Sequence, residues 1–227
     1  KLEQLQVSGT FKARGAFNSL LSRDVPPAGV IAASGGNHGA AVAYAARALG
    51  MRAEIFVPTI AAPAKVARLE AYGAIVHSVG QEYQETLEAS RTRQRETGAL
   101  TIHAYDQMET VAGQGTVASE WSEQSPELDT VLIAVGGGGL IGGVAAWYAD
   151  DVNVVAVETR GTATLHQALA AGRPVDVDIS GVGADALGAR RLGDIPFEVA
   201  RRHVAGSVLV SDEAVMAARS EIGRAHV

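Results

Sequence analysis

Four short runs rich in β-branched residues, each followed by a helical pattern or a turn, dominate the first half of the chain and constrain its fold most strongly. We predict strands at residues 30–33, 53–57, 74–79 and 100–103, with helices at 40–49, 64–72 and 83–96 between them. Each helix is followed closely by a glycine, a common residue at the C-terminal end of a helix. Strands and helices that alternate in this way form a parallel sheet with helices on both faces.

A second series of the same kind follows, and the boundary between the two is predicted between residues 105 and 110. Here we predict strands at 130–135, 152–157 and 207–210, with helices at 115–123, 140–148, 164–171 and from 212 onward. Residues 1–3 are predicted to lie in a strand, and the glycine-rich stretch 180–193 has no clear pattern. The predicted class is therefore α/β, with two doubly wound parallel-sheet lobes.

Composition excludes several kinds of function. The net charge is −6 and the basic residues are scattered, so we expect no nucleic-acid partner. The chain has no cysteine, which excludes disulfides and thiol chemistry. No apolar run approaches the roughly 20 residues that cross a bilayer. We expect a cytoplasmic protein without a membrane span.

Both ends of the sequence fall inside predicted elements. The chain begins without a methionine, and residues 221–227 end a helical pattern that has no cap. We therefore expect the natural protein to extend beyond both ends. Residues 222–227 also resemble the translation of a sequencing adapter, so we predict that they are a non-native tail and leave them out of the fold prediction.

Two segments near the start are candidates for chemistry. Lys12 lies between Phe11 and Arg14, and an apolar wall and a nearby cation could both lower the pKa of its amine; alone, it would more often be a surface lysine. Ser34-Gly35-Gly36-Asn37-His38-Gly39 joins a predicted strand to a predicted helix. The free N–H groups of a helix start can hold an anion such as a carboxylate, although a simple helix cap explains the same residues.

The glycine run Gly136-Gly137-Gly138-Gly139, which precedes Leu140, is the third candidate. Successive N–H groups at a helix start can hold a phosphate, and close packing seldom needs so many glycines. A competing hypothesis is a dinucleotide site, since Gly137, Gly139 and Gly142 fit G-x-G-x-x-G and Glu158 ends the next strand. That hypothesis predicts a nicotinamide-dependent oxidoreductase, but it gives the two earlier segments no role.

Taken in this order, the three segments resemble those of the fold-type II pyridoxal-phosphate enzymes, of which tryptophan synthase β is one and the threonine and serine dehydratases are others. The short motifs Pro63-Ala64-Lys65, Tyr72-Gly73-Ala74 and Gly113-Gln114-Gly115-Thr116 also fall at family positions. The resemblance covers about residues 1–221. It implies a large cofactor-binding lobe, residues 1–24 and 110–221, and a small substrate-loop lobe, residues 25–109.

The resemblance also implies a role for each segment. Lys12 would carry pyridoxal 5'-phosphate as a Schiff base and take the substrate Cα proton, and Phe11 would pack on the cofactor ring. Asn37 would bind the ring hydroxyl. The residues that would hold the phosphate are Gly136, Gly137, Gly138, Gly139 and Leu140. The residues that would hold the substrate carboxylate are Ser34, Gly35, Gly36, Asn37 and His38.

The reaction that the resemblance implies is the elimination of water from L-threonine or L-serine, which gives a 2-oxo acid and ammonia. Ala13 favours the dehydratase and racemase branch. Racemases typically carry a serine where Gly35 stands, so dehydration is favoured over racemisation. The alternatives are a serine racemase, a dehydratase for another β-hydroxy amino acid, and an inactive cofactor-binding fragment.

Three further expectations follow from the resemblance. The partner of the pyridine nitrogen would lie in a C-terminal stretch beyond this sequence. Some members bind a divalent cation near the position of Glu158, but Thr162 and Thr164 stand where a further acid is expected, so no metal site is predicted and Glu158 is only a candidate. We also expect a homodimer whose ligand is a small amino acid.

Overall fold

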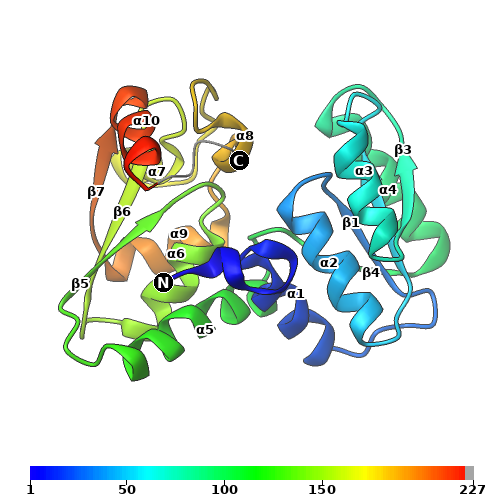
Figure 1. Cartoon of the computed structure of the whole chain (residues 1–227), viewed down its shortest axis with the longest axis horizontal. Helices are drawn as coiled ribbons and strands as arrows, with labels where there is room; N and C mark the ends of the chain where they lie inside the picture. Colours follow the sequence, from blue (N-terminus) through cyan, green and yellow to red (C-terminus); the bar gives the residue numbers. More distant parts are fainter. Residues whose placement is uncertain (223–227) are drawn as a thin grey trace. The chain divides into compact units, whose positions relative to one another are not determined.

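The computed structural model describes residues 1–222 and divides into two compact units. One unit is Lys1–Gln114 and the other begins at Gly115, so the division falls inside helix α5 (Met108–Gln124) (Figure 1). Each unit contains a parallel sheet, which confirms the predicted α/β class. The grouping of residues 1–24 with 110–221 in one lobe stays a prediction.

The sheet of the first unit has the strand order β3-β2-β1-β4, and all of its pairs are parallel. Its strands are β1 (Val30–Ala33), β2 (Ala53–Val57), β3 (Ile75–Ser78) and β4 (Leu100–Thr101). All four strands were predicted, and β3 and β4 are shorter than expected. The helices between them are α2 (Asn37–Ala48), α3 (Pro63–Ala71) and α4 (Tyr83–Thr97).

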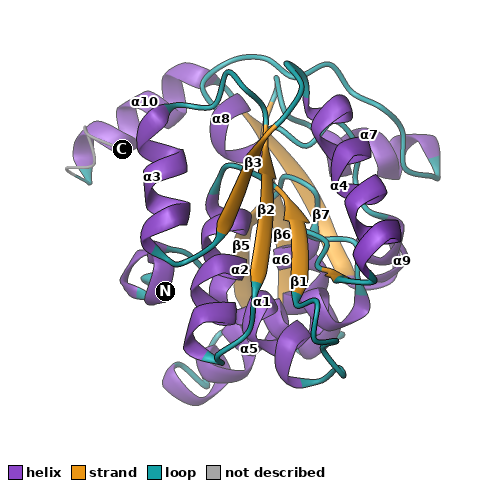
Figure 2. Cartoon of the chain, turned by 90° about the vertical axis from the view of Figure 1, so that its right-hand side faces the viewer, coloured by secondary structure: helices purple, strands orange, loops and turns teal. Residues whose placement is uncertain are grey.

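Strand β2 shows why helices cover both faces of this sheet. Ile55 and Val57 point to one face and belong to a core with the buried alanines of α2. Phe56 points to the opposite face, where it packs with Ile31 and with Ala89 of α4. Side chains alternate along a strand, so the consecutive apolar residues Ile55, Phe56 and Val57 need cover on both faces of the sheet. Figure 2 shows α2 and α3 on one side of these strands and α4 on the other.

The first residues form short helical turns, and the predicted strand at residues 1–3 is wrong. Two 3₁₀ turns, η1 (Glu3–Leu5) and η2 (Val7–Gly9), lead into helix α1 (Lys12–Leu21), which the sequence did not indicate. Helix α5 begins at Met108, seven residues earlier than expected. Its Gly113 lies inside the helix, where the lack of a side chain allows close packing. A Cβ at Gly113 would lie 2.7 Å from the Cα of Gly15, so α1 and α5 cross at backbone contact.

The second unit has the strand order β5-β6-β7, again parallel. Its strands are β5 (Thr130–Ala134), β6 (Asn153–Thr159) and β7 (Val204–Val210). Its helices after α5 are α6 (Gly139–Tyr148), α7 (Thr164–Ala171), α8 (Ala184–Leu187), α9 (Asp194–His203) and α10 (Asp212–Glu221). Helix α9 was not predicted. Its Pro196 stands in the first turn, where proline is tolerated.

Two findings concern the remaining expectations about the chain. None of the helices within residues 1–222 has the length and apolar character that crossing a bilayer requires. Of the predicted non-native tail, Ile222 follows α10, and residues 223–227 lie outside the described residues.

Candidate active site

Lys12 is the first residue of α1, and its side chain is turned into the first unit. Its Nζ donates a hydrogen bond to the carbonyl oxygen of Ala104 at 2.7 Å, and lies 5.3 Å from the centre of the Phe11 ring. Burial lowers the pKa of Lys12 from 10.5 to about 8. About a tenth of the amines are then neutral at pH 7, so this lysine can act as a nucleophile or a base.

The segment around Lys12 is fixed by ion pairs and an unusual backbone conformation. Arg14 binds Glu3 through both ends of its guanidinium, at 2.8 and 2.9 Å. This pairing occupies Arg14, and burial is the cause of the lowered pKa of Lys12, as the suggested apolar wall would require; a contribution from Arg14 stays a prediction. Ser8 is buried with a φ of 58°, and its carbonyl oxygen accepts a hydrogen bond from Arg68 of α3.

The loop Ser34–His38 lies where β1 ends and α2 begins, in the same unit as Lys12. Ser34 Oγ accepts a hydrogen bond from the N–H of Gly36 at 3.3 Å, while Asn37 is exposed at the first position of the helix. Among the described residues, no partner is seen for the N–H groups of Gly35, Asn37 and His38. These groups are therefore available to an anion at the helix start.

His38 contributes to this loop through its backbone alone. Its ring is buried and Nε2 lies 2.9 Å from the carbonyl oxygen of Ile102, to which it donates. Burial, and to a smaller extent the charge of Lys12, lower the pKa of His38 to about 3. The ring is thus neutral and already bound. Because His38 and Lys12 bind carbonyl groups only two residues apart, Lys12 and the start of α2 lie close together.

The segment after β4 lies next to Lys12 and was missed by the sequence analysis. His103 Nδ1 accepts hydrogen bonds from the N–H groups of Asp106 (2.8 Å) and Tyr105 (3.3 Å), and Ala104 between them is the acceptor for Lys12. Its position at the carboxyl end of a parallel strand could have indicated a functional role.

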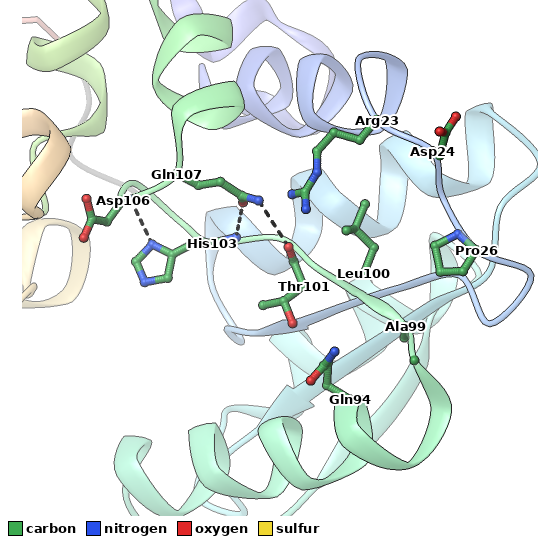
Figure 3. A pocket seen from close by; sticks show the side chains of 11 residues that line it. Arg23, Asp24, Pro26, Gln94, Ala99, Leu100, Thr101, His103, Asp106 and Gln107 are labelled. Atoms are coloured by element: carbon green, nitrogen blue, oxygen red, sulfur yellow. Dashed lines mark hydrogen bonds between the residues drawn. The ribbon is translucent and has the colours of Figure 1, made fainter.

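A groove of about 670 Å³ lies behind this segment (Figure 3). Neither Lys12 nor Ala104 lines it. The lining residues come from the segment after α1, from the end of α4 and from β4 and the segment after it: Arg23, Asp24, Pro26, Gln94, Gly98, Ala99, Leu100, Thr101, His103, Asp106 and Gln107. Gln107 closes one part of it: its Oε1 accepts from the N–H of His103 at 2.9 Å and its Nε2 donates to the carbonyl oxygen of Thr101 at 3.4 Å. The groove therefore borders the segment after β4 but is separate from the site around Lys12.

The glycine loop belongs to the second unit, between β5 and α6, and its carbonyl groups are fully engaged. The carbonyl oxygen of Gly136 accepts from Thr164 Oγ1 at 2.6 Å, and that of Gly137 from the N–H of Gly193 at 3.1 Å. The carbonyl oxygen of Gly138 accepts from the N–H of Gly142 at 2.8 Å. All three carbonyls are thus directed into the protein.

The N–H groups of the same loop have the opposite character. Within residues 1–222, no partner is seen for the N–H groups of Gly137, Gly138, Gly139 and Leu140. Gly138 has a φ of 91°, which L side chains rarely adopt, and it caps α6. Free donors at a helix start, with the carbonyls turned away, form a cradle that fits a phosphate.

Glu158 has a structural role in this unit. Its buried carboxylate accepts hydrogen bonds from the N–H groups of Leu165 and His166, both at 2.8 Å, and from Ser207 Oγ at 3.0 Å. It therefore caps α7, and these donors take up the oxygens that a ribose or a metal ion would need. No group of three or more candidate metal-binding side chains occurs in the described part of the chain.

Comparison with known proteins agrees with this geometry. The family model described as "Pyridoxal-phosphate dependent enzyme" matches residues 1–226. An L-threonine ammonia-lyase of Thermotoga maritima is 36% identical over 220 residues, which are 95% of this chain and 55% of that protein. A phenylserine dehydratase of Ralstonia pickettii is 39% identical, with 96% and 68% covered. The structure of maize serine racemase matches with a TM-score of 0.92 and 38% identity, covering 97% of this chain and 68% of that one.

Two parallel α/β sheets, a buried lysine at a helix start and a glycine cradle define the fold-type II class of pyridoxal-phosphate enzymes. The chain belongs to the family of pyridoxal-phosphate dependent enzymes, in its threonine and serine dehydratase branch. This membership replaces the nicotinamide-dependent alternative. The chain spans little more than half the length of the threonine ammonia-lyase that it matches.

Proposed function

We propose that this protein is a pyridoxal-phosphate-dependent lyase that eliminates water from L-threonine or L-serine, with release of a 2-oxo acid and ammonia. The observation that carries the proposal is the buried amine of Lys12, held at 2.7 Å from the Ala104 carbonyl oxygen beside the free N–H groups that begin α2. The relatives named a threonine ammonia-lyase and a phenylserine dehydratase support elimination from a β-hydroxy amino acid.

Each group of residues has a defined task in this proposal. The N–H groups of Gly137, Gly138 and Gly139 would hold the cofactor phosphate, Phe11 would pack against the ring, and Asn37 would bind the ring hydroxyl. When bound, pyridoxal phosphate supplies an electron sink for negative charge at the substrate Cα.

Lys12 moves the proton in the proposed reaction. Its neutral Nζ would accept the proton from the substrate Cα, and the lowered pKa keeps a useful fraction of the amine neutral near pH 7 to 8. The N–H groups of Gly35, Asn37 and His38 would hold the substrate carboxylate and so orient the Cα–H bond toward Lys12. The β-hydroxyl would then leave as water with a proton from Lys12, and hydrolysis of the resulting enamine would yield the 2-oxo acid and ammonia.

Serine racemisation is the second candidate, because the maize serine racemase structure is 38% identical to this chain. Racemisation needs a proton donor on the face of the substrate opposite Lys12. The family resemblance puts this donor at Gly35, which has no side chain to supply it. Dehydration is therefore our first choice. A homodimer in the cytoplasm is also proposed, on the family resemblance alone.

The decisive experiment measures 2-oxo acid and ammonia release from a panel of β-hydroxy amino acids. The panel contains L-threonine, L-serine, phenylserine and 3-hydroxyaspartate, and chiral chromatography of the same samples measures D-amino acid formation. We expect elimination from L-threonine or L-serine to dominate. Equal rates of racemisation and elimination, or turnover of phenylserine alone, would overturn the proposal.

A further inference from the structure

The carbonyl groups of Ile102, His103 and Ala104 are each bound by a side chain from a different part of the first unit. The carbonyl of Ile102 accepts from His38 Nε2 at 2.9 Å, and the carbonyl of Ala104 accepts from Lys12 Nζ at 2.7 Å. The carbonyl of His103 accepts from Thr110 Oγ1 at 3.1 Å. Each carbonyl group of this short segment is therefore held by one side-chain donor, and Lys12 is one of the three donors.

The ring of His103 fixes the turn that aims the Ala104 carbonyl. Nδ1 accepts from the N–H of Asp106 (Figure 3) and from the N–H of Tyr105. It therefore carries no proton, and the neutral ring has its proton on Nε2. Burial lowers the pKa of His103; the charge of Asp106 opposes this, and the charges of Lys12 and Arg91 add to it. Both histidines beside Lys12, His38 and His103, therefore stay neutral near pH 7.

We propose that His103 is a positioning residue, whose Nδ1 holds the turn in which the Ala104 carbonyl serves as the resting place of the free Lys12 amine. The inference deepens the proposed function: Lys12 has to be free of the cofactor when it takes the Cα proton, and a flexible four-carbon side chain then needs a fixed place. The Ala104 carbonyl provides one without moving the amine into water.

A neutral acceptor suits this task better than a carboxylate. A carboxylate would stabilise the ammonium form and raise the pKa of Lys12. A carbonyl oxygen holds the amine by one hydrogen bond, so burial can still keep the pKa near 8. The charges of Asp106 and Arg91 affect the pKa of His103. They are not among the causes of the lowered pKa of Lys12.

The test compares His103→Leu, which removes the acceptor, with His103→Asn, whose side-chain oxygen can accept from the same N–H groups in an Asx turn. The pKa of Lys12 is measured in the cofactor-free full chain from the pH dependence of amine labelling, with the peptide containing exposed Lys65 as an internal reference. In His103→Leu we expect the amine to reach water and its pKa to rise by at least about one unit. His103→Asn should keep it near 8.

Steady-state kinetics and the tautomer of His103 complete the test. In His103→Leu, kcat should fall by at least about tenfold with KM little changed, and His103→Asn should restore most of it. An unchanged Lys12 pKa in a folded His103→Leu protein, or equal damage in both variants, would overturn the proposal. If His103→Leu does not fold, ¹⁵N NMR of the wild-type histidines decides, since a proton on Nδ1 of His103 excludes the proposed turn.

These measurements separate the inference from the proposed function. Amine labelling of Lys12 and NMR of the His103 tautomer can both be measured without enzyme turnover. Failure of the substrate panel with the expected labelling would refute the lyase proposal alone, while lyase activity with an unshifted Lys12 in His103→Leu would refute only the positioning role.

Discussion

Gly35→Ser is the substitution that most directly tests the choice between elimination and racemisation. The loop has room for it: a Cβ at Gly35 would lie 3.4 Å from Val57 Cγ1 and 3.9 Å from the Cβ of Ala61, which are ordinary contacts. Gly35 also lies outside the left-handed region of φ. Ser34, one residue earlier, has its Oγ turned back to the N–H of Gly36, from which it accepts a hydrogen bond at 3.3 Å.

The expected size of the effect follows from these contacts. Since the added side chain meets no close neighbour, we expect the free energy of unfolding to change by less than about 1 kcal/mol. General acid–base catalysis typically contributes 10²–10⁴-fold. A newly placed hydroxyl, without other residues to orient it, should fall short of this range, so the ratio of racemisation to elimination should rise by about tenfold.

The assay follows D-serine by chiral chromatography and pyruvate by a coupled reaction, both from L-serine. Gly35→Ala is the matched control, because it fills the same space and has no proton to donate. We expect the ratio to rise in Gly35→Ser and to stay at the wild-type value in Gly35→Ala. The same change in both variants would show that loop shape, and not the hydroxyl, controls the outcome. A wild-type protein that racemises as fast as it eliminates would refute the one-residue reasoning.

Three other variants test the remaining structure. Lys12→Ala should abolish the visible absorbance of the bound cofactor and all turnover, and borohydride reduction of the wild type should leave the cofactor on the Lys12 peptide; an adduct on Lys65 would exclude the assignment. Glu54→Gln should lower the free energy of unfolding by about 2 kcal/mol at pH 7, since two arginines and a histidine bind this buried carboxylate. Hydrogen bonding to Arg93 lowers the pKa of Glu54 in the folded protein. The stability that the ionised carboxylate contributes is therefore present above about pH 4.3, the pKa of an unfolded glutamate, and is lost as the pH falls through the pKa of the folded protein. Urea unfolding from pH 7 to pH 3 should therefore show a smaller decrease in the free energy of unfolding for Glu54→Gln than for the wild type. Gly138→Asp should weaken cofactor binding and also destabilise the fold by about 2–4 kcal/mol, because a Cβ there would lie 2.6 Å from Leu192 Cδ1, and unchanged thermal unfolding would contradict this.

The strands were the most predictable part of the fold. Strands β1 and β2 begin and end at the predicted residues, because their β-branched and apolar residues suit a sheet that is covered on both faces, and Glu54 is the one charged residue among them. Helices α1 and α9 were missed, and each contains a residue of low helix propensity, Gly15 or Pro196. Contacts with distant segments give Gly15 its role, since a Cβ there would lie 2.9 Å from the carbonyl oxygen of Thr110.

The order of the three loops determined which family this chain belongs to, because a lysine segment, a helix start for a carboxylate and a glycine cradle are each defined by a few consecutive residues. Tertiary structure alone decided what lies around Lys12. The Ala104 carbonyl that binds it is 92 residues away along the chain, and the burial that lowers its pKa comes from several segments at once. Glu158 shows the same limit. Its place at the end of a strand suggested a ribose or a metal ligand, but the N–H groups of α7 had already taken its oxygens. A hydrogen-bond partner is chosen by distance in space, and the sequence gives only distance along the chain.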